Sequence, residues 1–173
     1  MKKIISICIS LILCLTLCSC DFMQDVMDLA ESVGNVQSKT FEFDGLTIEL
    51  TTGFLRMDFI SDDYDFVVGD GTVTVLGVKS DHDDTELRDL TVMEYAELFR
   101  ENMEEVNPTE IQEIDGIPTL QYAVDTDDGE QTFAVMYYKG TDCFWVVCFA
   151  AYTDIFPDNY DDICKYAKSV QCN

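Results

Sequence analysis

The sequence predicts an α+β domain in which an antiparallel β-sheet is flanked by helices on both faces. Short segments that alternate between apolar and polar residues are separated by Asp-Gly turns, which is typical of strands joined by hairpins. Two segments, 131–139 and 143–152, are apolar on both faces, which implies central strands that are covered from both sides. Two amphipathic helical patterns, 91–105 and 156–170, can supply that cover.

Residues 1–20 have the three parts of a secretory signal. Lys2 and Lys3 give a positive start, Ile4–Leu17 is an almost unbroken apolar run, and Leu17–Cys20 closes the segment. The run is too short for the roughly 20 residues that cross a bilayer as a helix. The alternatives are an uncleaved signal anchor and a signal peptide that is cut at another position.

The stretch Leu17–Cys20 resembles a bacterial lipobox, with an aliphatic residue at minus three, a small residue at minus one and the cysteine at plus one. Cys18 at minus two is less usual there than Ser, Ala or Thr. The resemblance implies a diacylglyceryl thioether on Cys20, removal of residues 1–19, and anchoring on the extracytoplasmic face of the cell membrane. Two acyl chains suffice for stable anchoring, whereas one chain gives marginal binding.

The chain is strongly acidic, since 34 Asp and Glu residues against 10 Lys and Arg residues give a formal charge of −24. Removal of residues 1–19 takes away Lys2 and Lys3 but no acidic residue, so the remaining 154 residues carry −26. This length is typical of one domain. A surface of this charge repels phosphate backbones and anionic headgroups, which disfavours binding to nucleic acid and directly to lipid surfaces.

Residues 20–38 are expected to tether the folded domain, 39–173, to the lipid anchor. Apolar residues from Phe22 to Val33 recur at helical spacing, which indicates a short amphipathic helix that ends near Gly34.

After residue 40 the apolar residues recur at every second position, which predicts strands. Asp44-Gly45 joins the first two strands through a preferred hairpin dipeptide, and Thr52-Gly53 and Asp70-Gly71 break the pattern further on. The segments expected to be extended are 41–43, 46–50, 55–60, 64–68 and 72–79.

A charged loop, 80–90, precedes the clearest helical pattern of the chain. Thr91-Val92-Met93-Glu94 matches a capping box, in which the hydroxyl and the carboxylate satisfy free amides at the start of a helix. The apolar stripe continues to about Glu105, and Asn107-Pro108 ends it. Four strands, 110–114, 119–126, 131–139 and 143–152, and a helix over about 156–170 complete the domain.

Four short stretches carry a family resemblance: Phe43–Ile48 leading to Gly53-Phe54, Tyr95-Ala96, Ile114–Pro118 and Ala167–Val170. With this order of elements, the chain resembles the PsbP/Mog-type α/β/α sandwich family over about residues 40–171. The matching residues form turns and core and carry no catalytic signature. The family includes photosystem accessory proteins, a Ran-binding protein, and bacterial envelope lipoproteins or secretion chaperones. The resemblance implies a non-enzymatic platform that binds other proteins.

Four cysteines follow the signal, at Cys143, Cys148, Cys164 and Cys172. An even number in an exported domain permits disulfides, but spacings of five, sixteen and eight lack the close pairs of structural zinc sites. Cys143 and Cys148 lie an odd number of positions apart in one strand, so they point to opposite faces and cannot share a metal or a bridge. We expect free thiols that act as small apolar side chains, and the disulfide state stays open.

His82 is the single histidine, and its neighbours Asp81, Asp83, Asp84 and Glu86 are all acidic. A His–Asp pair can act as a general base, so the alternative function is a small extracytoplasmic hydrolase that uses His82 and nearby carboxylates. However, carboxylates adjacent in sequence do not orient a histidine in space, and neither a Gly-x-Ser-x-Gly motif nor a Cys/His pattern accompanies it. We therefore expect no enzymatic activity, no catalytic residue and no cofactor.

Three carboxylate clusters suggest calcium, which prefers six to eight oxygen ligands. None fits the D-x-[DN]-x-[DN]-G loop, and Asp81–Glu86 lacks the glycine at position six, so we assign no metal site. The clusters are Asp62/Asp63/Asp65, Asp81/Asp83/Asp84/Glu86 and Asp125/Asp127/Asp128.

Four aromatic residues, Tyr137, Tyr138, Trp145 and Tyr152, could line a ligand groove, but aromatic side chains at strand spacing in central strands more often form core. The sequence as a whole therefore predicts a membrane-anchored extracytoplasmic module whose partner is another protein of the cell envelope.

Overall fold

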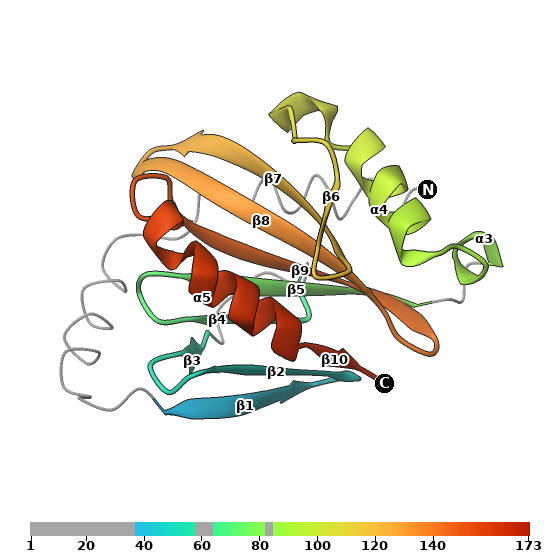
Figure 1. Ribbon diagram of the computed structural model, residues 1–173, viewed down its shortest axis with the longest axis horizontal. Helices are drawn as coiled ribbons and strands as arrows, with labels where there is room; N and C mark the ends of the chain where they lie inside the picture. Colours follow the sequence, from blue (N-terminus) through green and yellow to red (C-terminus); the bar gives the residue numbers. More distant parts are fainter. Residues whose placement is uncertain (1–36, 58–63, 82–84) are drawn as a thin grey trace.

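The computed structural model describes residues 37–57, 64–81 and 85–173, and Figure 1 shows how their strands and helices are arranged. The described strands form two antiparallel sheets, one of seven strands in the order β3-β4-β5-β9-β8-β7-β6 and one of three in the order β1-β2-β10. Helices pack on both faces of the larger sheet, which confirms the predicted α+β class. The strands span Ser38–Phe43 (β1), Leu46–Thr51 (β2), Leu55–Arg56 (β3), Phe66–Gly69 (β4), Thr74–Asp81 (β5), Gln112–Ile114 (β6), Ile117–Thr126 (β7), Gly129–Lys139 (β8), Cys143–Tyr152 (β9) and Gln171–Cys172 (β10).

Helix α4, Val92–Glu101, begins where the capping box predicts. The Glu94 N–H donates to Thr91 Oγ1 over 3.2 Å, and the Thr91 N–H donates to Glu94 Oε2 over 2.7 Å. Two amides that would otherwise lack partners are thus satisfied reciprocally.

The expected end of this helix near Glu105 is wrong, because the side chain of Asn102 turns back and its Nδ2 donates to Leu98 O over 2.7 Å. The chain then continues as a short 3-10 helix, η2, Glu104–Val106. The segment 80–90, expected as a loop, contains the short helix α3, Thr85–Arg88.

Strand β9 divides the core into two layers, as its double-sided apolar pattern predicts. From Cys143 to Ala151 the even-numbered side chains pack with α4, and the odd-numbered ones pack with the second helix, α5, Phe156–Ser169. The ring of Tyr95 in α4 stacks on Phe144 with centroids 4.3 Å apart. On the other face, Ile163 of α5 and Trp145 of β9 are both fully buried. Each helix therefore seals one face of the larger sheet.

The three-stranded sheet shares the face that α5 covers. Leu46, Ile48 and Leu50 of β2 are fully buried in the same cluster as Ile163. The two-residue strand β10, which the sequence analysis did not predict, follows α5 directly and pairs with the start of β2. The hydroxyl of Ser169, at the end of α5, makes a further contact with β2. Its Oγ accepts a hydrogen bond from the N–H of Glu49 and lies 3.2 Å from the Glu49 carbonyl oxygen. The C-terminal segment thereby fastens the hairpin β1–β2 to the helix.

Two predicted strands differ in length from the structure. The segment 55–60 is a strand only at β3, and residues 58–60 lie outside the described residues. The segment 110–114 is a strand only from Gln112 onward. Just before it, the Thr109 N–H donates to Gln121 O and the Gln121 N–H donates to Thr109 Oγ1, so Thr109 also contacts β7. In the part of the chain that the structure describes, no helix is both long and apolar enough to cross a membrane.

Candidate functional site

Several residues that the sequence singles out lie outside the described residues. Cys20, with its predicted lipid, is one of them, and His82 is another. The same holds for Asp62-Asp63 and Asp83-Asp84, which belong to two of the three carboxylate clusters. The anchor and the alternative hydrolase therefore stay predictions.

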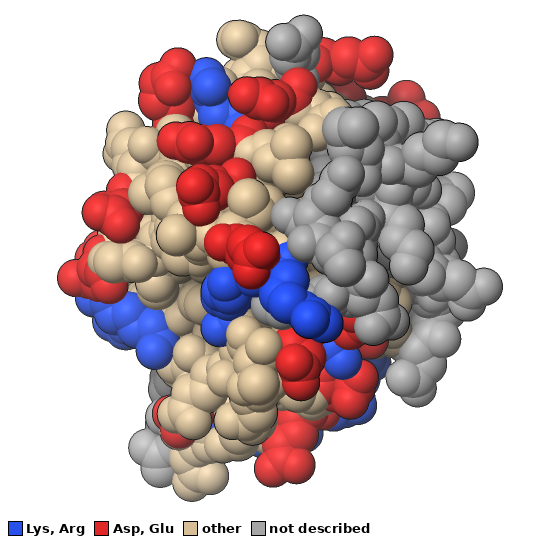
Figure 2. All heavy atoms as spheres, turned by 90° about the vertical axis from the view of Figure 1, so that its right-hand side faces the viewer, with Lys and Arg blue, Asp and Glu red and all other residues tan. Residues whose placement is uncertain are grey.

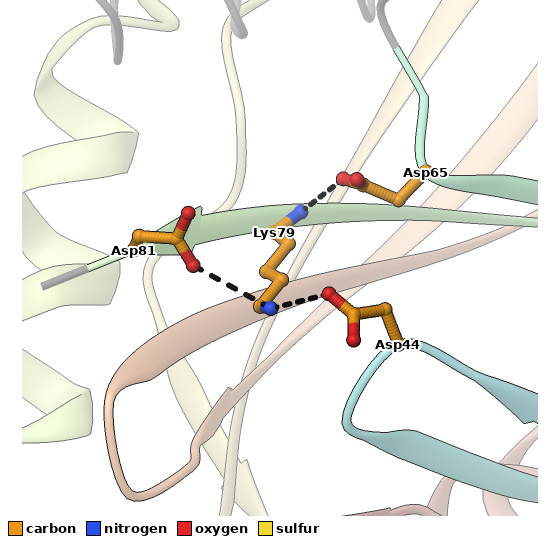
Figure 3. A network of polar contacts seen from close by, with 4 residues as sticks. All are labelled: Asp44, Asp65, Lys79 and Asp81. Carbon is orange, nitrogen blue, oxygen red and sulfur yellow. Dashed lines mark hydrogen bonds and ion pairs between the residues drawn. The ribbon is translucent and has the colours of Figure 1, made fainter.

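Two other members of those clusters contact one lysine, as Figure 3 shows. Lys79 Nζ in β5 lies 2.7 Å from Asp44 Oδ2 in the β1–β2 turn and 3.5 Å from Asp81 Oδ1. The Lys79 N–H donates to Asp65 Oδ2 over 2.6 Å. The hydrogen bond that Lys79 Nζ donates to Asp44 raises the pKa of Lys79 above its ordinary value. Asp65 thus binds the backbone of β5, and Asp81 contacts the side chain of Lys79. Because Asp44 contacts the same side chain from the β1–β2 turn, the network joins this hairpin to the larger sheet.

Cys143 and Cys148 are placed as the sequence predicts, whereas Cys164 and Cys172 are half-buried. Cys143 lies in the core layer with α5 and Cys148 in the layer with α4, on opposite faces of β9. All four described thiols are free. Burial raises the pKa of Cys148 well above its ordinary range, and it raises that of Cys172 to about 12. Thiols with raised pKa values are poor nucleophiles at neutral pH, because the thiolate is the reactive form.

Of the four aromatic residues weighed as a ligand groove, three belong to the packed interior. Tyr137 and Trp145 are buried, and the Tyr138 hydroxyl donates to Ala167 O of α5 over 3.0 Å. Tyr152, at the end of β9, differs because it is half-buried and lines a surface hollow. Of these four aromatic residues, only Tyr152 is in the lining of this hollow, where its ring would contact a bound ligand.

The hollow has a volume of about 630 Å³ and lies where the β7–β8 turn meets the loop between β9 and α5. Figure 1 shows both segments at the same end of the molecule, on the left. We call it the acidic hollow, since three of its lining residues carry carboxylates. It is lined by Asp128, Gly129, Glu130, Tyr152, Thr153, Asp154 and Ile155.

Two contacts position the walls of the acidic hollow. The N–H of Thr153 donates to Glu130 O over 3.0 Å, and the Thr153 and Thr132 hydroxyls lie 2.9 Å apart. Both contacts join the start of β8 to the segment that follows β9. The two walls, which are more than twenty residues apart in sequence, are thus held together by hydrogen bonds.

Exposed carboxylates surround the acidic hollow, and the segments that form it are acidic in sequence. Residues 117–138 and 143–164, which form β7, most of β8, β9 and the first half of α5, contain neither Lys nor Arg. Asp125 and Glu130 are directly opposite each other across the hairpin. Like charges at directly opposed positions of a hairpin are destabilising. The exposed carboxylates at this end are Asp125, Asp127, Asp128, Glu130, Asp154 and Asp158.

Charges are mixed at the opposite end of the molecule. Figure 2 shows that end, where Lys and Arg side chains gather near the centre of the face among Asp and Glu side chains. At the end of β8, Lys139 Nζ donates to Leu90 O over 2.6 Å and lies over the Phe144 ring, so this cation is used within the fold. The segments that form the acidic hollow differ in sequence, since 117–138 and 143–164 contain acidic residues but no Lys or Arg.

A metal site is not apparent in the ranges that the structure describes, which hold no group of three or more His, Cys, Asp and Glu side chains placed to bind an ion. The cluster Asp125/Asp127/Asp128 lies on one hairpin turn, with its carboxylates exposed. What the arrangement offers instead is a concave surface with an aromatic side chain and a negative rim.

The chain matches no protein-family model and no curated protein. Among solved structures it is similar to cyanobacterial PsbP (CyanoP) from Synechocystis sp. PCC 6803, with 14% identity, a TM-score of 0.52, and coverage of 91% of this chain and 99% of that chain. It is also similar to the Ran-binding protein Mog1p from Saccharomyces cerevisiae, with 12% identity, a TM-score of 0.49, and coverage of 80% and 96%. The similarity to CyanoP confirms the expected sandwich fold. At such identities no site residue transfers to this chain.

Proposed function

We propose that the mature protein is a lipoprotein anchored through Cys20 on the extracytoplasmic face of the cell membrane, and that its domain is a non-enzymatic module that binds another protein of the cell envelope. The observation that carries the binding role is the acidic hollow, a concave surface with Tyr152 and Ile155 in its lining and carboxylates at its rim. Binding sites are typically concave, largely apolar surfaces with a few polar groups, and this hollow falls within their usual range of about 300–1,000 Å³.

Anchoring is supported by the order of charged start, apolar run and Cys20 in the sequence. The first described strand, β1, begins at Ser38. A stretch that joins Cys20 to Ser38 can reach about 65 Å at most, at 3.3–3.6 Å per residue. Such a tether keeps the domain, and its acidic hollow, near the membrane surface and leaves it free to meet partners there.

Metabolic labelling with a fatty acid analogue tests the anchor. The wild-type chain should be labelled and found in the membrane fraction, and Cys20→Ala should be unlabelled and either uncut or released. Ser19→Ala keeps a small residue before the cysteine and serves as the matched control, with labelling expected as in wild type. Equal labelling of Cys20→Ala and wild type would contradict the anchor.

Cross-linking in intact cells tests the binding role. A tagged full-length chain should form a discrete adduct with an envelope protein, and an excess of the untagged chain should compete that adduct away. The hydrolase alternative predicts a different result: turnover of ester or peptide substrates that is lost in His82→Ala while the protein stays folded. Such turnover, or adducts that do not compete, would overturn the proposed function.

A further inference from the structure

We infer that the acidic hollow binds a segment of the partner protein that carries lysine or arginine side chains. This inference rests on the proposed function, because it names the surface and the partner chemistry of the same binding role. It follows from the shape of the hollow, from the charges around it and from the position of one aromatic ring.

The hollow offers an apolar contact as well as charge. A Cβ placed on Gly129 would lie 3.7 Å from Cδ1 and Cε1 of Tyr152, so the tyrosine ring lies against the β7–β8 turn. Gly129 has a φ of +130°, which disfavours any side chain that would fill this space. Lysine and arginine stems are apolar and pack on such surfaces while their heads stay in water, and a cation near an aromatic face gains a further attraction.

The carboxylates select a cation over an anion. Glu130 and Asp154 belong to the lining itself, and Asp127 and Asp158 are exposed on the same two segments. A cationic partner would relieve the repulsion between Asp125 and Glu130, which face each other across the hairpin. Complementary charge at an interface speeds encounter and rejects partners of the wrong sign.

A protein segment fits better than the other possible occupants. A second copy of this chain would bring the same carboxylates and the same negative charge, −24 for the whole sequence, against the hollow. A single metal ion would leave most of a volume of about 630 Å³ unfilled. A polyamine has the right charge but lacks side chains for the apolar lining, and the experiment below separates it from a peptide.

Binding of a fluorescein-labelled peptide of alternating lysine and valine to the full-length lipoprotein in detergent micelles tests the inference by anisotropy. The paired variant Glu130→Gln/Asp154→Asn should weaken binding about tenfold, which corresponds to about 1.4 kcal/mol. Tyr152→Leu should weaken it about threefold, because it removes the ring and keeps an apolar side chain. The matched control is Glu97→Gln/Glu101→Gln on the exposed side of α4, with the same change in charge and an expected affinity within about twofold of wild type.

Several outcomes would overturn the inference. If the control pair weakens binding as much as the hollow pair, the peptide responds to net charge alone. If spermine displaces the labelled peptide as well as unlabelled peptide does at equal charge, the site binds polyamines rather than a protein segment.

Cross-linking separates the two proposals. If Glu130→Gln/Asp154→Asn forms the same competable adduct as wild type in cells, the hollow is not the docking surface while the proposed function stands. If wild type forms no competable adduct, the proposed function itself fails.

Discussion

Lys79 Nζ lies 2.7 Å from Asp44 Oδ2, and this ion pair joins the β1–β2 turn to strand β5 of the larger sheet. Asp44 is 89% exposed, whereas the Lys79 side chain is only 21% exposed. Water screens an exposed carboxylate, so the pair itself contributes little to the free energy of unfolding. The apolar stem of Lys79 packs against the protein and contributes separately.

We expect Asp44→Asn to lower the free energy of unfolding by less than about 1 kcal/mol, and to lose that effect in high salt. Lys79→Ala should cost more, because it also removes the packed stem. Lys79→Met, which keeps the stem and loses the charge, is the matched control and should behave like Asp44→Asn. Urea midpoints of the unlipidated mature chain check the three values. A large loss in Lys79→Met that persists in high salt would show that the ion pair matters more than its exposure indicates.

The capping box of α4 should make stability depend on pH. Hydrogen bonds from the Thr91 backbone and hydroxyl lower the pKa of Glu94 below its ordinary value. A carboxyl with a lowered folded-state pKa stabilises the protein above its unfolded pKa, about 4.3, and loses that contribution as the pH falls through the folded-state pKa. Glu94→Gln should therefore be less stable than wild type at neutral pH and equally stable below that window.

Thr91→Ala removes the cap itself and should cost about 1 kcal/mol at neutral pH. Glu97→Gln, an exposed residue of the same helix, controls for the loss of one negative charge. Urea titrations at a series of pH values give the comparison. A constant difference between Glu94→Gln and wild type across the acid range would show that the carboxylate does not act through this hydrogen bond.

Gly77 lies under an aromatic ring in the larger sheet. It is the cross-strand partner of Phe66, and a Cβ placed on Gly77 would overlap the Phe66 ring. Phe66 in turn stacks on Phe43 of the hairpin, with ring centroids 3.7 Å apart. We expect Gly77→Ala to lower the free energy of unfolding by about 1–3 kcal/mol, since the ring must move in a packed core.

Gly116 provides the control for this prediction. Its φ is +82° and nothing lies within 4 Å of the added Cβ, so Gly116→Ala tests backbone strain without a clash. We expect a cost of about 1 kcal/mol there. Thermal or urea midpoints that fall equally for both variants would show that the Phe66 ring does not limit space at Gly77.

The β7–β8 hairpin should gain stability when one of its charges is removed. Because Asp125 faces Glu130 in the register, their carboxylates repel each other. We expect Glu130→Gln to raise the free energy of unfolding by about 0.2–1 kcal/mol. Glu113→Gln, an exposed residue of β6, is the control and should lie within about 0.5 kcal/mol of wild type. A loss of stability in Glu130→Gln would mean that this carboxylate makes a favourable contact within the fold.

The apolar patterns in the sequence predict the larger sheet well. The apolar residues on both faces of 131–139 and 143–152 correctly indicate two central strands with core on both sides. The face that each helix covers could not be predicted, because the stripes of α4 and α5 are both apolar and either fits either face. Strand β10 was missed since two residues, Gln171–Cys172, are too short to show a period.

The acidic hollow was missed for a different reason. Its walls, near Glu130 and Tyr152, come together only when β8 and β9 pair. In the sequence, the carboxylates of this turn were considered only as calcium ligands, and no site was assigned to them. One signal in the sequence could have found it: the lack of any Lys or Arg in 117–138 and 143–164, beside a hairpin turn with carboxylates on both strands.

Ile163 gives the sharpest test of the two-layer core. It is fully buried against the larger sheet in the layer with Trp145, while its neighbour Asp162 is exposed and lies 2.6 Å from Lys165 Nζ. Ile163→Asp would place a carboxylate in this apolar layer, with a penalty of several kcal/mol unless it stays protonated or α5 detaches. Domains are stable by roughly 5–15 kcal/mol, so a loss of this size is expected to unfold much of the protein.

Asp162→Ala is the matched control, one position away on the same helix. It removes an exposed ion pair, and we expect its free energy of unfolding to lie within about 0.5 kcal/mol of wild type. Ile163→Val, which removes a single methylene from the same site, should cost about 0.5–1.5 kcal/mol and so remain folded and measurable. Urea midpoints of the three variants give the comparison. If Ile163→Asp, Ile163→Val and Asp162→Ala all unfold at the same urea concentration, α5 does not seal this face of the sheet.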